Sequence, residues 1–176
     1  MFTRLLKKVL IWLNRKVGVN MSKNTLSTPL LIANTLLDRA FSENEPITHL
    51  KLQKLIYFVY KRFLKETDKS LFDEYFEVWT HGPVLPSIYD EFKRYAAEDI
   101  SDYVYSECDD IVRIIASENT DFHAALNWVW ENYGRQSPTR LRNLTHEDGT
   151  AWQRTKEEGK LYISDDFIIE EKWVIP

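Results

Sequence analysis

The fold is decided by residues 50–64, which read LKLQKLIYFVYKRFL. Apolar side chains recur there every three or four positions, which is the spacing of one helical face. Thr48 stands just before the run and is a suitable N-cap residue. The pattern therefore predicts a helix that lies at the centre of the fold. Its apolar stripe comprises Leu52, Leu55, Ile56, Val59 and Phe63, with basic residues at polar positions around it.

Similar periodicity on both sides of this segment predicts further helices. Thr28-Pro29 has the form of an N-cap followed by proline at the first helical position, and the apolar positions after it give a helix of about four turns. Helical patterns are also predicted for three later segments: one from Pro86 or Ser87, one over about 120–133, and a short one from Ser137-Pro138.

Short stretches between these helices have the character of strands or turns. Residues 75–79 are aromatic and β-branched, and residues 110–115 form a second short segment of this kind. His81-Gly82-Pro83 is expected to form a turn, because glycine permits positive φ and proline fixes its own φ. Ser164 can cap a last helix to Lys172, although the apolar pattern there also allows a strand.

Length and composition indicate one compact domain. The chain has 176 residues, of which 44% are hydrophobic and 14% aromatic, enough to bury a substantial core. We therefore expect a mainly α fold: a single-domain helical bundle with short β segments near 75–79 and 110–115. The single cysteine excludes an intramolecular disulfide and a cysteine-based zinc site, which fits a reducing cytoplasm.

Charge is distributed unevenly along the chain. Residues 1–20 carry five basic residues and no acid, whereas residues 21–176 carry 18 basic and 27 acidic residues, a net charge of −9. An acidic body argues against nucleic-acid binding, which depends on neutralising phosphates, and favours a partner with a basic surface. The apolar runs are too short to span a membrane.

The sequence contains no recognisable catalytic or metal motif. None of the four histidines belongs to a pair with metal-ligand spacing. No nucleophile elbow and no phosphate-binding glycine loop is present, and the adjacent carboxylates are typical of solvated surface. The chain is therefore expected to be no enzyme and to need no cofactor or metal.

The tract from Tyr75 to Tyr89 is the most unusual in composition. It combines Trp79, His81 and the Gly82-Pro83 pair within a few residues. This combination indicates either a rigid corner that covers the core or a rigid aromatic platform for a partner. Tryptophan and tyrosine are common in both settings, so the residue types alone leave the two interpretations open.

Several separated motifs stand in order along the chain. They are LQKLIY at 52–57, LFDE at 71–74, FEVWTHGPVLP at 76–86, YDEF at 89–92, and Leu141-x-x-Leu144-Thr145-His146 followed by Trp152. Together these motifs resemble the Panacea domain of SocA-like and phage-associated antitoxins, and the resemblance covers about residues 30–172. Val78 stands where alanine is frequent in that family, and His81 stands where an aromatic residue is common.

The resemblance implies a helical antitoxin that neutralises a cognate protein toxin, the product of an adjacent gene, by direct binding. Two alternatives are an adaptor that delivers a toxin to a ClpXP-type protease and a DNA-binding regulator of its own operon. The family brings no catalytic residue. The expected partner-binding residues are Lys51, Gln53, Lys54, Trp79, His81, Gly82, Pro83, Tyr89, His146 and Trp152.

Residues 1–20 lie outside the resemblance and are predicted to form a separate basic extension, with residues 21–176 as the antitoxin domain. An apolar stripe over residues 2–17 predicts an amphipathic helix. Such a helix could dock on its own domain, lie on an anionic membrane or enter a groove of the toxin. Alternatively, Met21 is the true start of the protein.

Overall fold

The computed structural model describes residues 27–106, 110–114 and 119–174. They form seven α-helices and one two-stranded sheet, which confirms the expected mainly α bundle. The predicted helix over residues 2–17 lies outside the described residues. The elements are α2 (Pro29–Glu43), α3 (His49–Thr67), β1 (Glu77–Trp79), β2 (Gly82–Val84), α4 (Pro86–Phe92), the 3-10 helix η1 (Lys93–Tyr95), α5 (Thr120–Tyr133), α6 (Pro138–Thr145), α7 (Ala151–Glu157) and α8 (Asp165–Glu170).

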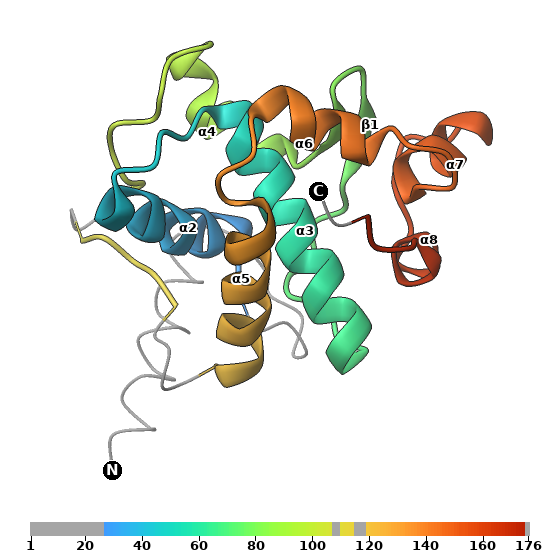
Figure 1. Ribbon diagram of the computed structural model, residues 1–176, viewed down its shortest axis with the longest axis horizontal. Coiled ribbons are helices and arrows are strands. Elements are labelled where there is room, and N and C mark those ends of the chain that lie inside the picture. Colours follow the sequence, from blue (N-terminus) through green and yellow to red (C-terminus); the bar gives the residue numbers. More distant parts are fainter. Residues whose placement is uncertain (1–26, 107–109, 115–118, 175–176) are drawn as a thin grey trace.

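Helix α3 is the centre of the molecule, as its apolar pattern predicts. Figure 1 shows α2 and α5 on one side of α3, with α7 and α8 on the other. Helix α3 packs against α2, α4, α5, α6, α8 and β2. Because neighbours surround it, even Lys54 and Lys61, which the sequence pattern places at polar positions, are buried. Each of these lysines is accommodated by a polar partner inside the fold.

Several helices begin directly after the N-cap residues that the sequence predicts. The hydroxyls of Thr48, Ser137 and Ser164 each accept a hydrogen bond from a backbone N–H in the first turn of α3, α6 and α8. The C-terminal segment is therefore a helix, not the alternative strand. Thr150 caps α7 in the same way, but α7 was not predicted, because its seven residues follow a loop and carry little apolar periodicity.

The turn of the β-hairpin begins one residue earlier than the sequence predicts. Thr80 and His81 form the two-residue turn, whereas Gly82 and Pro83 belong to β2 and lie opposite Trp79 and Val78. The prediction of a turn at His81-Gly82-Pro83 is therefore wrong for the last two residues. Gly82 provides the positive φ of +99° at the start of the strand. Pro83 is tolerated because β2 lies at an edge of the sheet.

The predicted strand near 75–79 is confirmed by β1, but the other segment differs. Within described residues 110–114 the backbone makes one isolated bridge, between Tyr105 and Ile111, and no strand. Residue 115 lies outside the described residues. On the other side of β1, Val78 N–H donates to the carbonyl of Leu161 over 2.8 Å and Ile163 N–H donates to that of Phe76 over 2.9 Å. The hairpin is therefore attached to the segment between α7 and α8.

A buried carboxylate joins the C-terminal segment to the centre of the fold. The side chain of Glu171 is 3% exposed and forms a salt bridge of 2.6 Å with Lys61 Nζ. It also accepts hydrogen bonds from the Tyr57 hydroxyl at 2.5 Å and from the backbone N–H of Ala151 at 2.8 Å. Burial, together with the nearby Glu171 charge, raises the pKa of Tyr57. This single carboxylate therefore connects α3, the start of α7 and the C-terminal segment.

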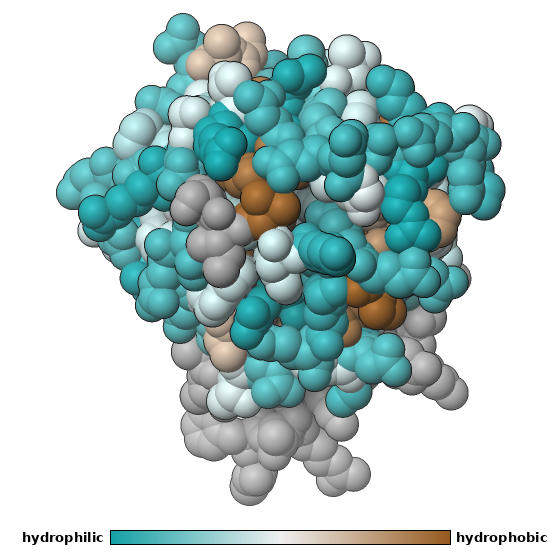
Figure 2. Space-filling model, turned by 45° about the vertical axis from the view of Figure 1, so that its right-hand side comes forward, coloured by the Kyte–Doolittle hydropathy of each residue, from teal (hydrophilic) through white to brown (hydrophobic). Residues whose placement is uncertain are grey.

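The surface is dominated by polar side chains. Figure 2 shows one face on which apolar residues emerge only in small patches between hydrophilic ones. In the described part of the chain, no helix is both long and apolar enough to cross a membrane.

Candidate partner-binding surface

Gln53 and Lys54 attach the hairpin to the first turns of α3. The Gln53 amide donates to the Leu85 carbonyl and accepts from the Leu85 N–H, both over 3.0 Å. Lys54 Nζ donates to the Pro83 carbonyl over 2.6 Å. Both side chains are buried, with Lys54 at 0% exposed. They therefore lie beneath the expected binding surface, where they hold the hairpin in place and cannot themselves contact a partner in this conformation.

Gly82 allows β2, Lys54 and α6 to approach one another closely. A Cβ atom at this position would lie 2.6 Å from Thr145 Oγ1 and 2.9 Å from Lys54 Nζ. Real side chains do not tolerate such distances, and the φ of +99° is itself unfavourable for residues other than glycine. The residue at 82 therefore decides how tightly the hairpin packs on α3 and α6.

Aromatic side chains extend this corner over the neighbouring helices. The rings of Trp79 and Tyr89 lie 4.8 Å apart, and those of His146 and Trp152 lie 3.8 Å apart. Trp152 Nε1 donates to the Trp79 carbonyl over 3.0 Å, while Trp79 Nε1 donates to Glu77 over 2.7 Å. The hairpin, α4 and the start of α7 therefore meet in one aromatic cluster.

The part of this corner that a partner can reach is small. Thr80 and His81 are exposed at the turn, and Trp79, Tyr89 and His146 are half-buried. Trp152, at 4% exposed, and Pro83 are buried beneath them. We call the five accessible residues the hairpin surface. Trp79 thus has one side in the protein interior and one side in solvent, which the composition alone left undecided.

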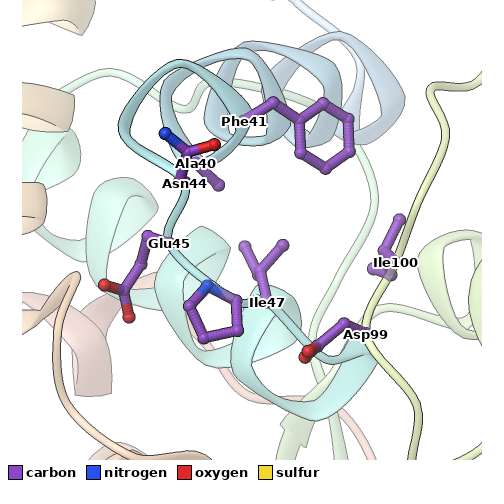
Figure 3. A pocket seen from close by; sticks show the side chains of 8 residues that line it. Ala40, Phe41, Asn44, Glu45, Ile47, Asp99 and Ile100 are labelled. Atoms are coloured by element: carbon purple, nitrogen blue, oxygen red, sulfur yellow. The ribbon is translucent and has the colours of Figure 1, made fainter.

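Lys51 lies apart from the hairpin surface. Its ammonium forms an ion pair of 2.7 Å with Glu45 and donates to the Pro46 carbonyl over 3.1 Å. Glu45 and Pro46 line a shallow, open pocket of about 380 Å³ between the end of α2 and residues 99–100. Figure 3 shows Phe41 and Ile47 around this pocket. Lys51 therefore stabilises the α2–α3 connection and is not brought together with the other candidate residues.

Two basic residues near the hairpin surface were not among the sequence-predicted candidates: His49 and Arg142. His49 begins α3 and lies 6.1 Å, ring to ring, from Tyr89. The Arg142 carbonyl accepts a hydrogen bond of 2.7 Å from His146 Nδ1. Arg142 lies within the quoted Leu141–His146 motif, so the motif pointed to the region, but no pattern indicated that its side chain approaches α3.

His49, Lys54, Arg142 and His146 bring four basic groups to this region of the structure. Burial, with a smaller effect from Arg142, lowers the pKa of Lys54 to about 7. Burial also lowers the pKa of His49 and of His146, and the Lys54 charge lowers both further. Every charged group that shifts these three pKa values is itself a cation.

The arrangement is suited to recognition. Among the described residues, no group of three histidine, cysteine or acidic side chains is placed to hold a metal ion. The hydrogen bonds of Gln53, Lys54 and Trp152 fix the backbone of the hairpin, and the accessible side chains are aromatic or basic. A preformed surface of this kind binds a partner with a low ordering cost.

Comparisons with known proteins show the family to which the chain belongs. The model of the family described as "Antitoxin SocA-like, Panacea domain" matches residues 52–153, the stretch from the first turns of α3 to α7 that contains the hairpin surface. Antitoxin SocA of Caulobacter vibrioides (strain NA1000 / CB15N) is 35% identical over 126 residues, which are 69% of this chain and 66% of that protein. No solved structure matches the chain. The chain therefore belongs to the SocA-like antitoxin family, whose members carry the Panacea domain.

Proposed function

We propose that this protein is an antitoxin that neutralises a cognate protein toxin by binding it through the hairpin surface. The observation that carries the proposal is the rigid attachment of the hairpin: buried Gln53 and Lys54 hold its backbone while Trp79 and His81 remain accessible. Exposed aromatic side chains on a fixed backbone are typical of binding hot spots. The family of the chain supports the antitoxin role, and the proposal requires no catalytic step.

The first test is neutralisation. We expect the reading frame next to this gene to encode a protein that stops growth when expressed alone, and co-expression of this chain to restore growth. The two purified proteins should form a complex. Protection that disappears in a host lacking ClpXP-type proteases, while the purified proteins do not bind each other, would contradict direct neutralisation and favour delivery of the toxin to a protease.

The second test concerns Trp79. Replacing Trp79 by alanine removes the accessible ring and its contact with Tyr89. At a binding hot spot this costs about 2 kcal/mol or more of binding free energy. Because Trp79 is half-buried, thermal unfolding must be measured in parallel. Trp128→Ala is the control: Trp128 is also half-buried but lies on α5, where it contacts Trp173. Equal loss of toxin affinity in both variants would exclude a specific role for the hairpin surface.

A further inference from the structure

The three buried lysines of α3 differ in what neutralises them. Lys51 has Glu45 at 2.7 Å and Lys61 has Glu171 at 2.6 Å. Lys54, the most deeply buried of the three, donates to a backbone carbonyl, and in the described part of the chain no carboxylate forms a salt bridge with it. A buried ammonium without a counter-ion is costly. Among these three buried lysines, Lys54 is therefore the one without a salt bridge to a described carboxylate.

Three further basic side chains lie around Lys54, and the Arg142 charge adds to its own. Arg142 reaches this region from α6, His146 follows the end of that helix, and His49 stands at the N-terminal end of α3, where the helix dipole is positive. Among the described residues, Arg142 Nε and His49 Nδ1 are buried without a hydrogen-bond partner. Four basic side chains thus lie in one region, and among the described residues no carboxylate forms a salt bridge with any of them.

An incoming acid can approach this cluster from solvent. Arg142, His49 and His146 are half-buried, so each has a part that faces outward. Lys54 is covered, and it contributes its charge from beneath Gly82 and Pro83. Trp79 and Tyr89 of the hairpin surface lie alongside. The Arg142 guanidinium and the His49 ring, at the edge of an aromatic surface, provide directed donors for a carboxylate. His146 contributes by position only, because its two ring nitrogens face the carbonyls of Arg142 and Thr80.

We propose that the cluster of His49, Lys54, Arg142 and His146 receives an aspartate or glutamate side chain of the toxin, which supplies the missing counter-ion and fixes the orientation of the toxin on the hairpin surface. This inference rests on the proposed function. The net charge of −9 on residues 21–176 favours a partner whose surface is mainly basic and which inserts a single acid at this cluster. The same net charge repels polyanions such as nucleic acids.

The experiment compares two arginines of α6. Arg142→Gln removes the charge of the cluster, whereas Arg140→Gln removes an exposed charge two residues away on the same helix. The full chain is titrated with the purified toxin after thermal melts confirm that both variants are folded. We expect Arg142→Gln to weaken binding about thirtyfold or more, as loss of one member of a desolvated charge pair does, and Arg140→Gln to weaken it less than about threefold. Equal effects of the two substitutions would overturn the proposal.

A charge exchange identifies the acid. Arg142→Glu should abolish protection in cells, and substitution of one aspartate or glutamate of the toxin by arginine should restore it. Restoration only by toxin substitutions that do not involve an acidic residue would contradict the proposed pairing.

A probe without the toxin separates this inference from the proposed function. The peptide acetyl-Glu-Glu-Glu-amide, its glutamine counterpart and inorganic phosphate are each titrated into the full chain while side-chain NMR signals of arginine and histidine are followed. Only the glutamate peptide should shift the signals of Arg142 and His146. In Arg142→Gln, which has no Arg142 signal, this peptide should shift the His146 signal only weakly. No shift with this peptide, or shifts with phosphate alone, would overturn the inference even if the toxin is bound. If the toxin is not bound but the peptide is, the proposed function fails while the carboxylate site stands.

Discussion

At the scale of single residues, Gly82 and Lys54 determine the geometry of the hairpin surface. Gly82 lets the hairpin approach α6, and Lys54 holds the Pro83 carbonyl from below. The sequence indicated both positions but assigned Lys54 to a surface for direct contact. The structure places it inside the fold, because the hairpin covers the first turns of α3.

Gly82→Ala should destabilise the fold and weaken toxin binding. A positive φ costs an alanine about 1–2 kcal/mol, and crowding of the new methyl group against Thr145 and Lys54 adds about 1–3 kcal/mol. Gly149→Ala is the control, because Gly149 also has a positive φ, +80°, but no atom within 4 Å of the added Cβ. Urea denaturation measures both variants. If Gly149→Ala cost as much as Gly82→Ala, the close packing inferred for the hairpin would be wrong.

Lys54 should make stability depend on pH. Its pKa is about 7 in the folded chain and 10.5 without burial, so between these values the folded chain has released a proton that the unfolded chain retains. Stability should therefore rise with pH from 7 to 9, by up to about 1.4 kcal/mol per unit. Below pH 7 Lys54 is protonated in both the folded and the unfolded chain, so it no longer contributes to the pH dependence of stability. The groups facing Lys54 are Arg142, His49 and His146, and burial lowers the pKa of both histidines, which moves their titration away from this window.

The pH effect is measured by urea denaturation at several pH values. Lys54→Met keeps a similar side-chain length but cannot titrate, so the rise in stability should disappear. Lys156→Met replaces an exposed lysine of α7 and should keep the rise. A slope that is the same in wild type and Lys54→Met would show that another group is responsible.

At the scale of helices, the fold depends on polar contacts between segments that are distant in sequence. Glu171 connects α3, α7 and the C-terminal segment through Lys61, Tyr57 and the Ala151 N–H. Asn34 of α2 plays a similar part by bonding the backbone of Val104 and Val112. These buried groups determine where the less periodic segments lie against the helices.

Glu171→Gln should destabilise the protein by about 3–5 kcal/mol, because it leaves the Lys61 ammonium buried without a counter-ion. Adding Lys61→Met to this variant should recover part of the loss, since the unpaired charge is then absent. Chemical denaturation of the two single variants and the double variant measures the coupling. Strictly additive losses would show that the Lys61–Glu171 pair is not the main cause.

At the scale of the whole molecule, the described residues between 27 and 174 contribute one continuous apolar core around α3. The family model begins at residue 52, inside this core, so the folded unit is longer than the matched segment. Ile32 and Leu36 of α2, which precede the matched segment, are fully buried. The packing therefore requires α2 as part of the domain.

Deletion of residues 1–20 should leave the cooperative thermal unfolding of the chain intact, because the core of residues 27–174 is continuous without them. Liposome binding and toxin protection are measured on the same variant, and loss of either one alone identifies the role of the basic segment. As a contrast, deletion through Glu43 removes α2 and should abolish folding. Loss of the cooperative transition after deletion of residues 1–20 would show that our domain boundary is wrong.

Local sequence was sufficient to predict most of the helices, their N-caps and the region of the candidate site. Periodic apolar positions and N-cap hydroxyls act within a few residues, so the starts of α2, α3, α6 and α8 could be read directly. The family motifs pointed to the hairpin for the same reason, since its residues are contiguous. The short helix α7 has too few turns for a period to be recognised, and it was missed.

Only the tertiary structure decided which charged side chains are buried and which groups meet. Lys54 and Lys61 occupy similar positions in the sequence pattern, but Lys61 is paired with Glu171, whereas Lys54 lies near Arg142 of α6 and the basic residue His49 at the start of α3. The energy of a buried charge depends on what surrounds it in three dimensions, and those neighbours come from segments up to 110 residues away. The basic cluster beside the hairpin is therefore a property of packing, which no local pattern of residues could predict.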